Sequence, residues 1–193
     1  MEEENYFKKI TDHLKPSVGL KNYLRYVLQK RAFKKKQTIA VTDPYFSTLL
    51  FIGTGTLRLY AIREEEETTI LFWQKNQFLT PMFMLGNYLE KEVYVEFLED
   101  TTLIGYRQTH TANLYKLFPE YREIINRLYQ QQLAALMRHA EALAYLNTST
   151  RFENLMKAKP ELFTLCRLKI IADYLGIHPK VLSLLRSKAV KKQ

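Results

Sequence analysis

Apolar residues in the first part of the chain recur at spacings of three and four, which is the period of an amphipathic helix. The pattern covers residues 6–31 and is broken by Pro16 and Gly19, two residue types that weaken helices. We therefore expect helical structure over 6–31, interrupted at these positions.

After residue 31 the period changes to two, as in strands that bury one face. The runs are rich in β-branched and aromatic residues and are separated by turn signals such as Asp43-Pro44, Gly53 and Glu99-Asp100. They cover residues 33–41, 45–52, 55–63, 68–73, 92–98 and 101–107. Short strands at this interval predict a small β-sandwich or β-roll, and the acidic run 64–67 is expected to be a solvated hairpin tip.

The segment 75–91 is a long and unusually apolar gap between two predicted strands. It could cover the open end of the sheet and so form one side of a ligand cavity. On that interpretation the effector pocket is lined by Phe78, Met82, Met84, Leu85 and Tyr94. The alternative is that these Met and Phe side chains only fill the core.

A second change of pattern follows Phe118-Pro119. Residues 120–147 contain no Gly or Pro and carry apolar residues at helical spacing, which predicts one helix of about 40 Å. Its length favours a dimerisation helix that pairs with a second copy. The candidate interface residues are Leu128, Leu133, Leu136, Met137, Ala140 and Leu143. The alternative is a helix that folds entirely onto its own β-domain.

Residues 168–188 have the spacing of a helix-turn-helix. Ala172 allows two helices to cross closely, Gly176 supplies a residue that tolerates positive φ in the turn, and Leu182 anchors the second helix. His178-Pro179 are expected to begin that second helix. A further helix over 151–158 is predicted, capped by Ser149 or Thr150. An ordinary helical hairpin remains the alternative to a DNA-binding unit.

Charge favours the DNA-binding interpretation. The chain has a net charge of +9, and residues 151–193 hold ten Lys or Arg against Glu153, Glu161 and Asp173, so this segment contributes +7. Positive charge concentrated on a helix-turn-helix is expected of a surface that neutralises DNA phosphates.

Other chemistry has little support in the sequence. A single cysteine, Cys166, excludes an intrachain disulfide and clusters of several thiolates, and the four histidines are scattered. No catalytic Ser/His/Asp set, phosphate-binding glycine loop or paired carboxylate stands out. We expect a protein that is not an enzyme and that holds no metal or cofactor. The acidic N-terminus and the lack of a long apolar run predict a cytoplasmic protein without membrane contact.

The order of these parts resembles the Crp/Fnr transcription regulators. FIGTGTLRLY (51–60) is similar to a hairpin motif of that family, VYVEFLEDTTLIGY (93–106) resembles its late strand pair, and residues 151–188 are similar to its C-terminal signature. The resemblance implies an α+β fold with a jelly-roll-like sensory β-roll (1–117), a dimerisation helix (118–147) and a helix-turn-helix DNA-binding domain (148–193). It also implies a homodimer whose partners are double-stranded DNA, RNA polymerase and an unidentified small effector.

Two departures from the family pattern limit what can be carried over. Thr80-Pro81 stands near the family's Gly-Glu pair, and Glu92 stands near the Arg that neutralises a cyclic phosphate. A carboxylate there repels phosphate, so we expect no binding of a cyclic nucleotide in the usual manner. Lys180 and Leu184 replace a Glu and an Arg of the recognition helix, which predicts a different DNA sequence preference or weaker direct readout.

The candidate DNA contacts fall into two groups. Lys180, Ser183, Arg186 and Ser187 are expected in the major groove, with His178 at the start of the helix, whereas Lys169 and Lys188 are expected at phosphates. The alternative function is a degenerate β-roll that acts through protein contacts or an unidentified ligand, with weak or no specific DNA binding.

Overall fold

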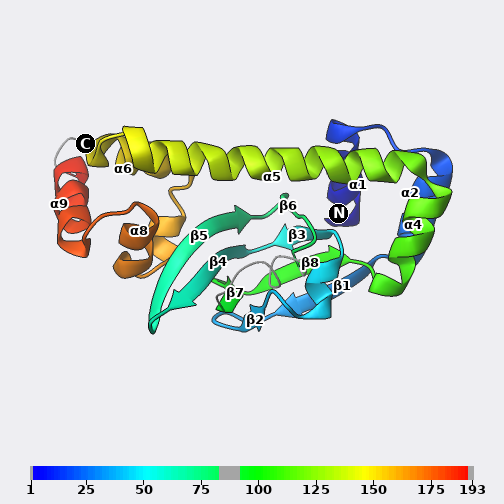
Figure 1. Cartoon of the computed structure of the whole chain (residues 1–193), viewed down its shortest axis with the longest axis horizontal. Coiled ribbons are helices and arrows are strands. Elements are labelled where there is room, and N and C mark those ends of the chain that lie inside the picture. The colour runs from blue at the N-terminus through cyan, green and yellow to red at the C-terminus, as the bar shows by residue number, and fades with distance from the viewer. Residues whose placement is uncertain (1, 83–91, 191–193) are drawn as a thin grey trace.

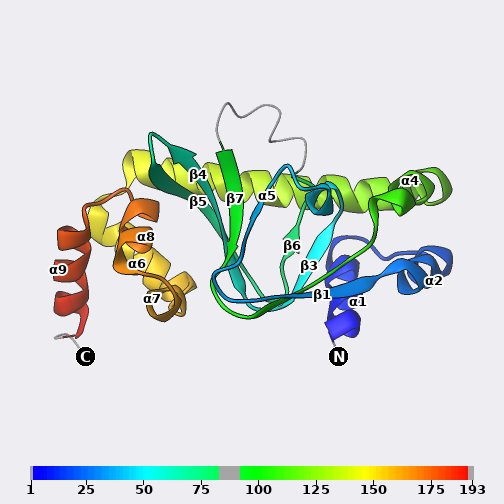
Figure 2. The same cartoon turned by 90° about the horizontal axis from the view of Figure 1, so that it is seen from below.

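The computed structural model describes residues 2–82 and 92–190, and no side chain is described for Val190. A long helix, α5 (Pro119–Tyr145), runs the length of the molecule (Figure 1). Helices α1, α2 and α4 lie at one end, helices α6 to α9 lie at the other, and the strands lie between them, as the view from below also shows (Figure 2). None of the described helices combines the length and hydropathy needed to cross a lipid bilayer.

The N-terminal region forms two helices, α1 (Glu2–His13) and α2 (Val18–Val27). The break at Pro16 is confirmed, and Ser17 begins the second helix because its hydroxyl accepts a hydrogen bond from the Leu20 amide at 3.1 Å. Gly19 does not break the pattern, since it lies inside α2. The prediction of helix up to residue 31 is wrong, because β1 (Gln29–Phe33) pairs with a strand near residue 103.

Within residues 2–82 and 92–190, eight strands form two antiparallel four-stranded sheets. The remaining strands are β2 (Thr38–Ala40), β3 (Leu50–Thr54), β4 (Thr56–Arg63), β5 (Glu66–Gln74), β6 (Phe78–Leu79), β7 (Glu92–Phe97) and β8 (Thr101–Gly105). One sheet has the order β1-β8-β3-β6 and the other β2-β7-β4-β5. The predicted α+β fold class with an N-terminal β-roll is confirmed.

Two predicted strands are shorter than expected. The run 33–41 contains only the last residue of β1 and the three residues of β2, which belong to different sheets, so the chain crosses between the sheets within it. The run 45–52 begins as a 3-10 turn, η1 (Pro44–Ser47), because the Asp43 carboxylate accepts the Tyr45 amide at 2.8 Å. Gly55 turns β3 into β4 with φ +98°, and a Cβ there would lie 2.8 Å from the Thr101 Cα.

The inner faces of the two sheets pack against each other and fill the roll. Alternate residues of β4, Leu57, Leu59 and Ala61, are buried in this cluster together with Trp73, as the period of two requires. Large side chains therefore occupy the interior of the roll.

A second apolar cluster lies outside the roll, where the N-terminal helices, η2 (Gln108–His110) and α4 (Thr111–Leu117) join α5. Tyr6 meets both Phe51 and Phe78 edge-on, and Tyr121 and Ile124 of α5 are fully buried in the same cluster. The first half of α5 is thus held against its own β-domain.

The C-terminal region consists of α6 (Thr148–Ala158), α7 (Leu162–Leu165), α8 (Leu168–Tyr174) and α9 (Pro179–Val190). Helix α6 starts at Thr148 rather than at 151. Its N-cap is Asn147, whose side chain accepts a hydrogen bond from the Thr150 amide at 2.9 Å. The predicted caps at Ser149 and Thr150 are therefore wrong. The two-helix unit α8-α9 turns at Gly176 with φ +62°, and Ala172 and Leu182 are fully buried, as predicted from their spacing.

Candidate nucleic-acid interface

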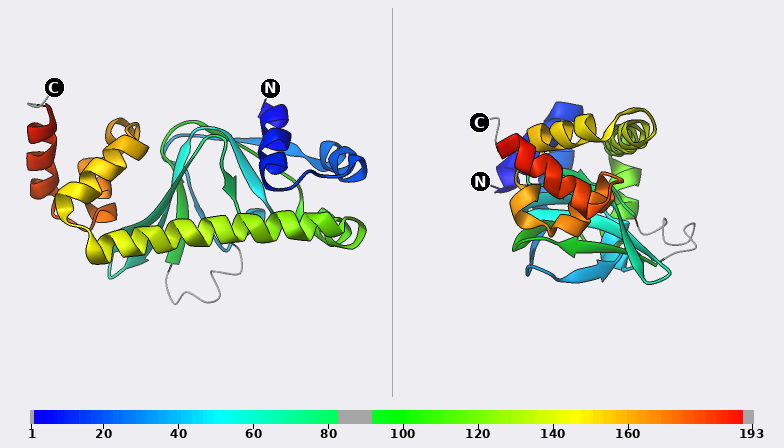
Figure 3. Two further views of the ribbon diagram at one scale, coloured as in Figure 1. Left: turned by 90° about the horizontal axis from the view of Figure 1, so that it is seen from above. Right: turned by 90° about the vertical axis from the view of Figure 1, so that its left-hand side faces the viewer.

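Helix α9 stands at the far end of the molecule from the N-terminal helices (Figure 3). It packs inward through Leu182, which is fully buried, and through Leu185, which is partly buried. The remaining surface carries the exposed candidates Lys180, Ser183, Arg186, Ser187 and Lys188. The structure thus brings five of the seven predicted DNA contacts together on one helix.

His178 caps this helix. Its Nδ1 accepts a hydrogen bond from the Lys180 amide at 3.2 Å, and Pro179 occupies the first helical position, where its missing N–H costs nothing. His178 thus caps the start of α9, as expected. Its Nδ1 is engaged by the Lys180 amide.

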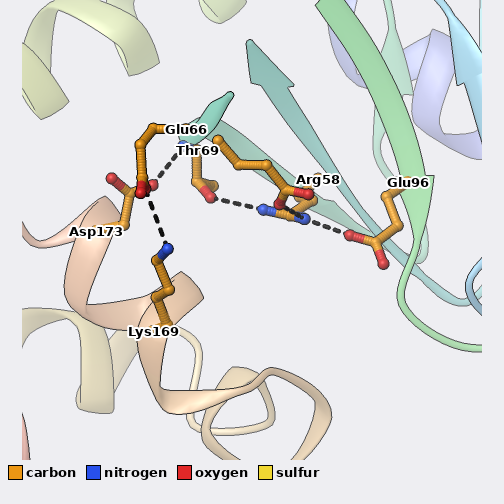
Figure 4. A network of polar contacts seen from close by, with 7 residues as sticks. Arg58, Glu66, Thr69, Glu96, Lys169 and Asp173 are labelled. Carbon is orange, nitrogen blue, oxygen red and sulfur yellow. Dashed lines mark hydrogen bonds and ion pairs between the residues drawn. The ribbon is translucent and has the colours of Figure 1, made fainter. Parts of the chain in front are cut away.

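Lys169 has a different environment from the α9 residues. It lies on α8, and its Nζ binds Glu66 of β5 at 3.0 Å (Figure 4). Both side chains are about 70% exposed. A surface ion pair of this kind contributes only about 0–1 kcal/mol, so a competing phosphate can displace Glu66 at small cost.

The acidic run 64–67 is more than a solvated hairpin tip, which corrects the expectation from sequence. Glu64 and Glu65 form the turn with positive φ, whereas Glu66 and Glu67 belong to β5. Glu67 binds the guanidinium of Arg58 at 2.5 Å. Three of the four carboxylates therefore pair with basic groups: Glu64 with Arg63 at 3.7 Å, Glu67 with Arg58 of the β-roll, and Glu66 with Lys169 of the helical domain.

Arg58 is the centre of a polar network between the two domains (Figure 4). Its side chain is only 4% exposed; its Nε donates to Glu96 of β7 at 2.5 Å, and its Nη1 donates to the Thr69 hydroxyl at 3.1 Å. The Thr69 amide in turn donates to the Asp173 carboxylate of α8. Hydrogen bonds thus run from β7 through β4 and β5 to the helix-turn-helix. A cavity of about 530 Å³ lies at this junction.

A second set of contacts joins the helical domain to the end of α5. Arg151 of α6 donates to the carbonyl oxygens of Leu175 at 2.9 Å and Leu146 at 2.6 Å. The rings of His139 and Tyr174 are stacked with centroids 4.0 Å apart, and burial lowers the pKa of His139.

Lys159 connects the helical domain to the sheet. Its Nζ donates to the Phe72 carbonyl of β5 at 2.8 Å, and burial lowers the pKa of its ammonium group to about 8. Phe72 itself belongs to the apolar cluster formed by α6 to α9. Polar and apolar contacts therefore fix the orientation of the helix-turn-helix on the roll.

The second half of α5 leaves an apolar surface uncovered. Leu133 is 57% exposed and Met137 is 64% exposed, and Ala140 and Ala144 continue the same line at alternating steps of three and four residues. We call Leu133, Met137, Ala140 and Ala144 the exposed α5 stripe.

The other predicted interface residues lie elsewhere on α5. Leu128 is 3% exposed and belongs to the protomer's own core, so it is not available to a partner. Leu136 is partly buried against the inner cluster of the roll. Leu143 is 41% exposed, and its Cδ2 lies 3.0 Å from where a Cβ on Gly176 would stand, so it packs beside the turn of the helix-turn-helix.

Known structures share this arrangement, although no family model and no curated protein sequence matches the chain. A transcriptional regulator assigned to the Crp/Fnr family from Eubacterium rectale is 19% identical with a TM-score of 0.68, over 91% of this chain and 84% of the other. FixK2 from Bradyrhizobium japonicum is 15% identical with a TM-score of 0.70, over 86% of each chain. The c-di-GMP responsive global regulator CLP from Xanthomonas campestris is 15% identical with a TM-score of 0.63, over 91% of this chain and 93% of its own.

This chain has the Crp/Fnr fold. The likeness covers 86–91% of the chain, as the order of the sequence motifs had indicated. Two of the three neighbours are described as regulators, and none is described as an enzyme.

The predicted effector pocket of the Crp/Fnr roll is not brought together as expected. Met84 and Leu85 lie outside the described residues. Phe78 is buried in the outer cluster and Met82 in the inner one, so the two side chains do not share a cavity wall. Tyr94 stacks on Tyr60 with centroids 5.7 Å apart on the outside of β7.

The two positions that depart from the family pattern have partners within the chain. The Thr80 hydroxyl is buried and donates to Gln132 of α5 at 2.9 Å. Glu92 accepts a hydrogen bond from the Tyr94 hydroxyl at 3.1 Å. Within residues 2–82 and 92–190, no three His, Cys, Asp or Glu side chains gather as a metal site would require.

Proposed function

We propose that this protein is a dimeric, sequence-specific DNA-binding transcription regulator of Crp/Fnr type. The observation that carries the proposal is α9, a helix-turn-helix recognition helix that stands at one end of the molecule with Lys180, Arg186 and Lys188 exposed. A double helix offers phosphates to the cations and base edges to the shorter side chains. On this proposal residues 1–117 sense a signal, 118–147 dimerise and 148–193 bind DNA in the cytoplasm.

In the proposed dimer, two copies pair through the exposed α5 stripe. A two-fold axis along a helix pair relates the two α9 helices, and it places them on one side of the dimer. Two recognition helices in successive major grooves lie about 34 Å apart, which is one turn of DNA. The preferred site is therefore an inverted repeat.

The signal that the roll senses is not a cyclic nucleotide bound in the family's usual manner. Glu92 presents a carboxylate near the position of the phosphate-binding Arg. The Thr80 hydroxyl already donates a hydrogen bond to Gln132. The proposal includes a small-molecule effector and RNA polymerase as classes of partner. It assigns neither the chemistry of the effector nor the residues that contact the polymerase.

Single alanine variants on α9 separate phosphate contacts from base contacts. Lys188→Ala should weaken binding to all duplexes equally and reduce the slope of log affinity against log salt by about one unit, because one fewer counterion is released. Arg186→Ala should cost about 1–3 kcal/mol on the preferred site and relax preference at one base pair. Fluorescence anisotropy on the preferred and a scrambled duplex measures both.

The β4 residue Arg63 provides the matched control, since it is an exposed cation on the roll rather than on α9. Arg63→Ala should leave affinity and salt slope unchanged. If neither α9 variant alters binding, α8-α9 is a structural hairpin and the roll acts through protein contacts instead.

A further inference from the structure

The outward surface of α9 is not wholly polar. Leu184 is 64% exposed and Val181 is 40% exposed, and they lie three residues apart on the same side of the helix. Leu184 follows the fully buried Leu182 by two residues, which is about 200° around a helix of 3.6 residues per turn. The Leu184 side chain therefore points almost directly away from the core of its own domain.

Cations and hydroxyls surround this apolar pair. Lys180 precedes Val181, Ser183 precedes Leu184, and Arg186, Ser187 and Lys188 follow within the next turn, all of them exposed. In the described part of the helical domain, the acidic side chains Glu153, Glu161 and Asp173 all lie outside α9. A partner that fits this surface combines dense negative charge with small apolar groups.

Double-stranded DNA has that combination in its major groove. The edges of the base pairs there present hydrogen-bond donors and acceptors, and the C5-methyl group of thymine is the apolar feature among them. A protein surface as partner would need carboxylates around an apolar socket. The positive charge of α9 is complementary to the phosphates of any DNA sequence and gives no sequence preference. The apolar pair has a sequence-dependent partner in the thymine methyl groups.

We propose that Leu184 and Val181 read thymine methyl groups, so that each half-site contains A·T pairs where these two side chains enter the groove. This inference rests on the proposed DNA-binding function and adds a specificity to it. Lys188 then contacts phosphate and Lys180 and Arg186 contact other base edges, while the apolar pair distinguishes thymine from cytosine and from unmethylated uracil.

Deoxyuridine provides a direct probe, because it pairs as thymidine does and lacks only the methyl group. Burying one methyl contributes about 0.8 kcal/mol, which is about a fourfold change in the dissociation constant. In the preferred duplex, we expect replacement of one particular thymidine by deoxyuridine to weaken wild-type binding about fourfold. Leu184→Ala should bind the two duplexes equally, since the side chain that contacts the methyl is gone.

Arg186→Ala is the matched control on the same helix. It should bind both duplexes more weakly than the wild type but keep the fourfold preference for thymidine. Circular dichroism of Leu184→Ala should match the wild type, because the replaced side chain is exposed.

The outcomes distinguish this inference from the function on which it rests. Sequence-specific binding that is insensitive to deoxyuridine at every position overturns the inference and leaves the DNA-binding function intact. A preference at one and the same thymidine that persists in both Leu184→Ala and Val181→Ala also overturns it. Absence of any specific duplex binding overturns both proposals.

Discussion

Replacing Met137 by Glu should convert the proposed dimer into monomers. Met137 lies at the centre of the exposed α5 stripe, and a two-fold helix pair brings the same position of both protomers together at the seam. The change would place two carboxylates in apolar surroundings next to each other. Each buried, unpaired charge costs several kcal/mol, so the dissociation constant should rise by more than about 100-fold.

Sedimentation velocity at micromolar concentration measures this change. Gln131→Glu is the control, because it adds the same carboxylate to an exposed position on another side of the same helix and should leave the dimer intact. Leu136 is less suitable for this test, since it also packs on the roll and its replacement would disturb the protomer. A Met137→Glu protein that sediments as an unaltered dimer would place the interface elsewhere.

Replacing Arg58 by Met should lower the free energy of unfolding more than the other substitutions do. Methionine keeps much of the volume but removes the charge, which leaves Glu96 without its ion-pair partner; Glu96 is 18% exposed and Glu67 is 48% exposed. Breaking a buried ion pair from one side costs about 3–5 kcal/mol. Because Glu67 can turn to solvent, we expect about 3 kcal/mol, measured by urea unfolding.

Two further variants identify the cause of that loss. Arg63→Met removes an exposed cation from the same strand and should change the free energy of unfolding by less than about 0.5 kcal/mol. Adding Glu96→Gln to Arg58→Met should recover part of the stability, because the orphaned charge is removed. An Arg58→Met protein as stable as the wild type would show that the network does not stabilise the roll.

Local pattern was sufficient to predict the helix-turn-helix and the centre of the roll. Gly176 and Leu182 lie within a few residues of the partners that define the turn, so their spacing alone specifies the geometry. Strand β4 spans 56–63 against a predicted 55–63 and points Leu57, Leu59 and Ala61 into the roll as its period of two predicts, although its other face, which carries Arg58, is also buried.

Long-range partners could not be predicted in this way. Arg58 binds Glu96, which lies 38 residues away, and Asp173 binds the amide of Thr69, which lies 104 residues away. The signal in the sequence was an Arg inside a β-strand motif followed by four glutamates, but a charge run alone does not indicate which carboxylate is bound.

Periodicity also fails to tell one apolar surface from another. Leu128 and Leu133 both fit the helical pattern of α5, yet Leu128 is buried in its own protomer and Leu133 is exposed to solvent. The difference arises because the outer cluster covers only the first half of the helix. The sequence 29–31 similarly fits a helical pattern, and it becomes a strand because β8 offers it a pairing edge.

Selection of bound duplexes from a random DNA pool tests the central claim most directly. The account predicts enrichment of an inverted repeat whose half-site centres lie about 10 base pairs apart, with binding that weakens steeply as salt rises. Met137→Glu should abolish enrichment of the full repeat. If the duplexes bound by the wild-type protein show no enriched sequence at either low or high salt, the claim that this chain is a DNA-binding regulator is contradicted.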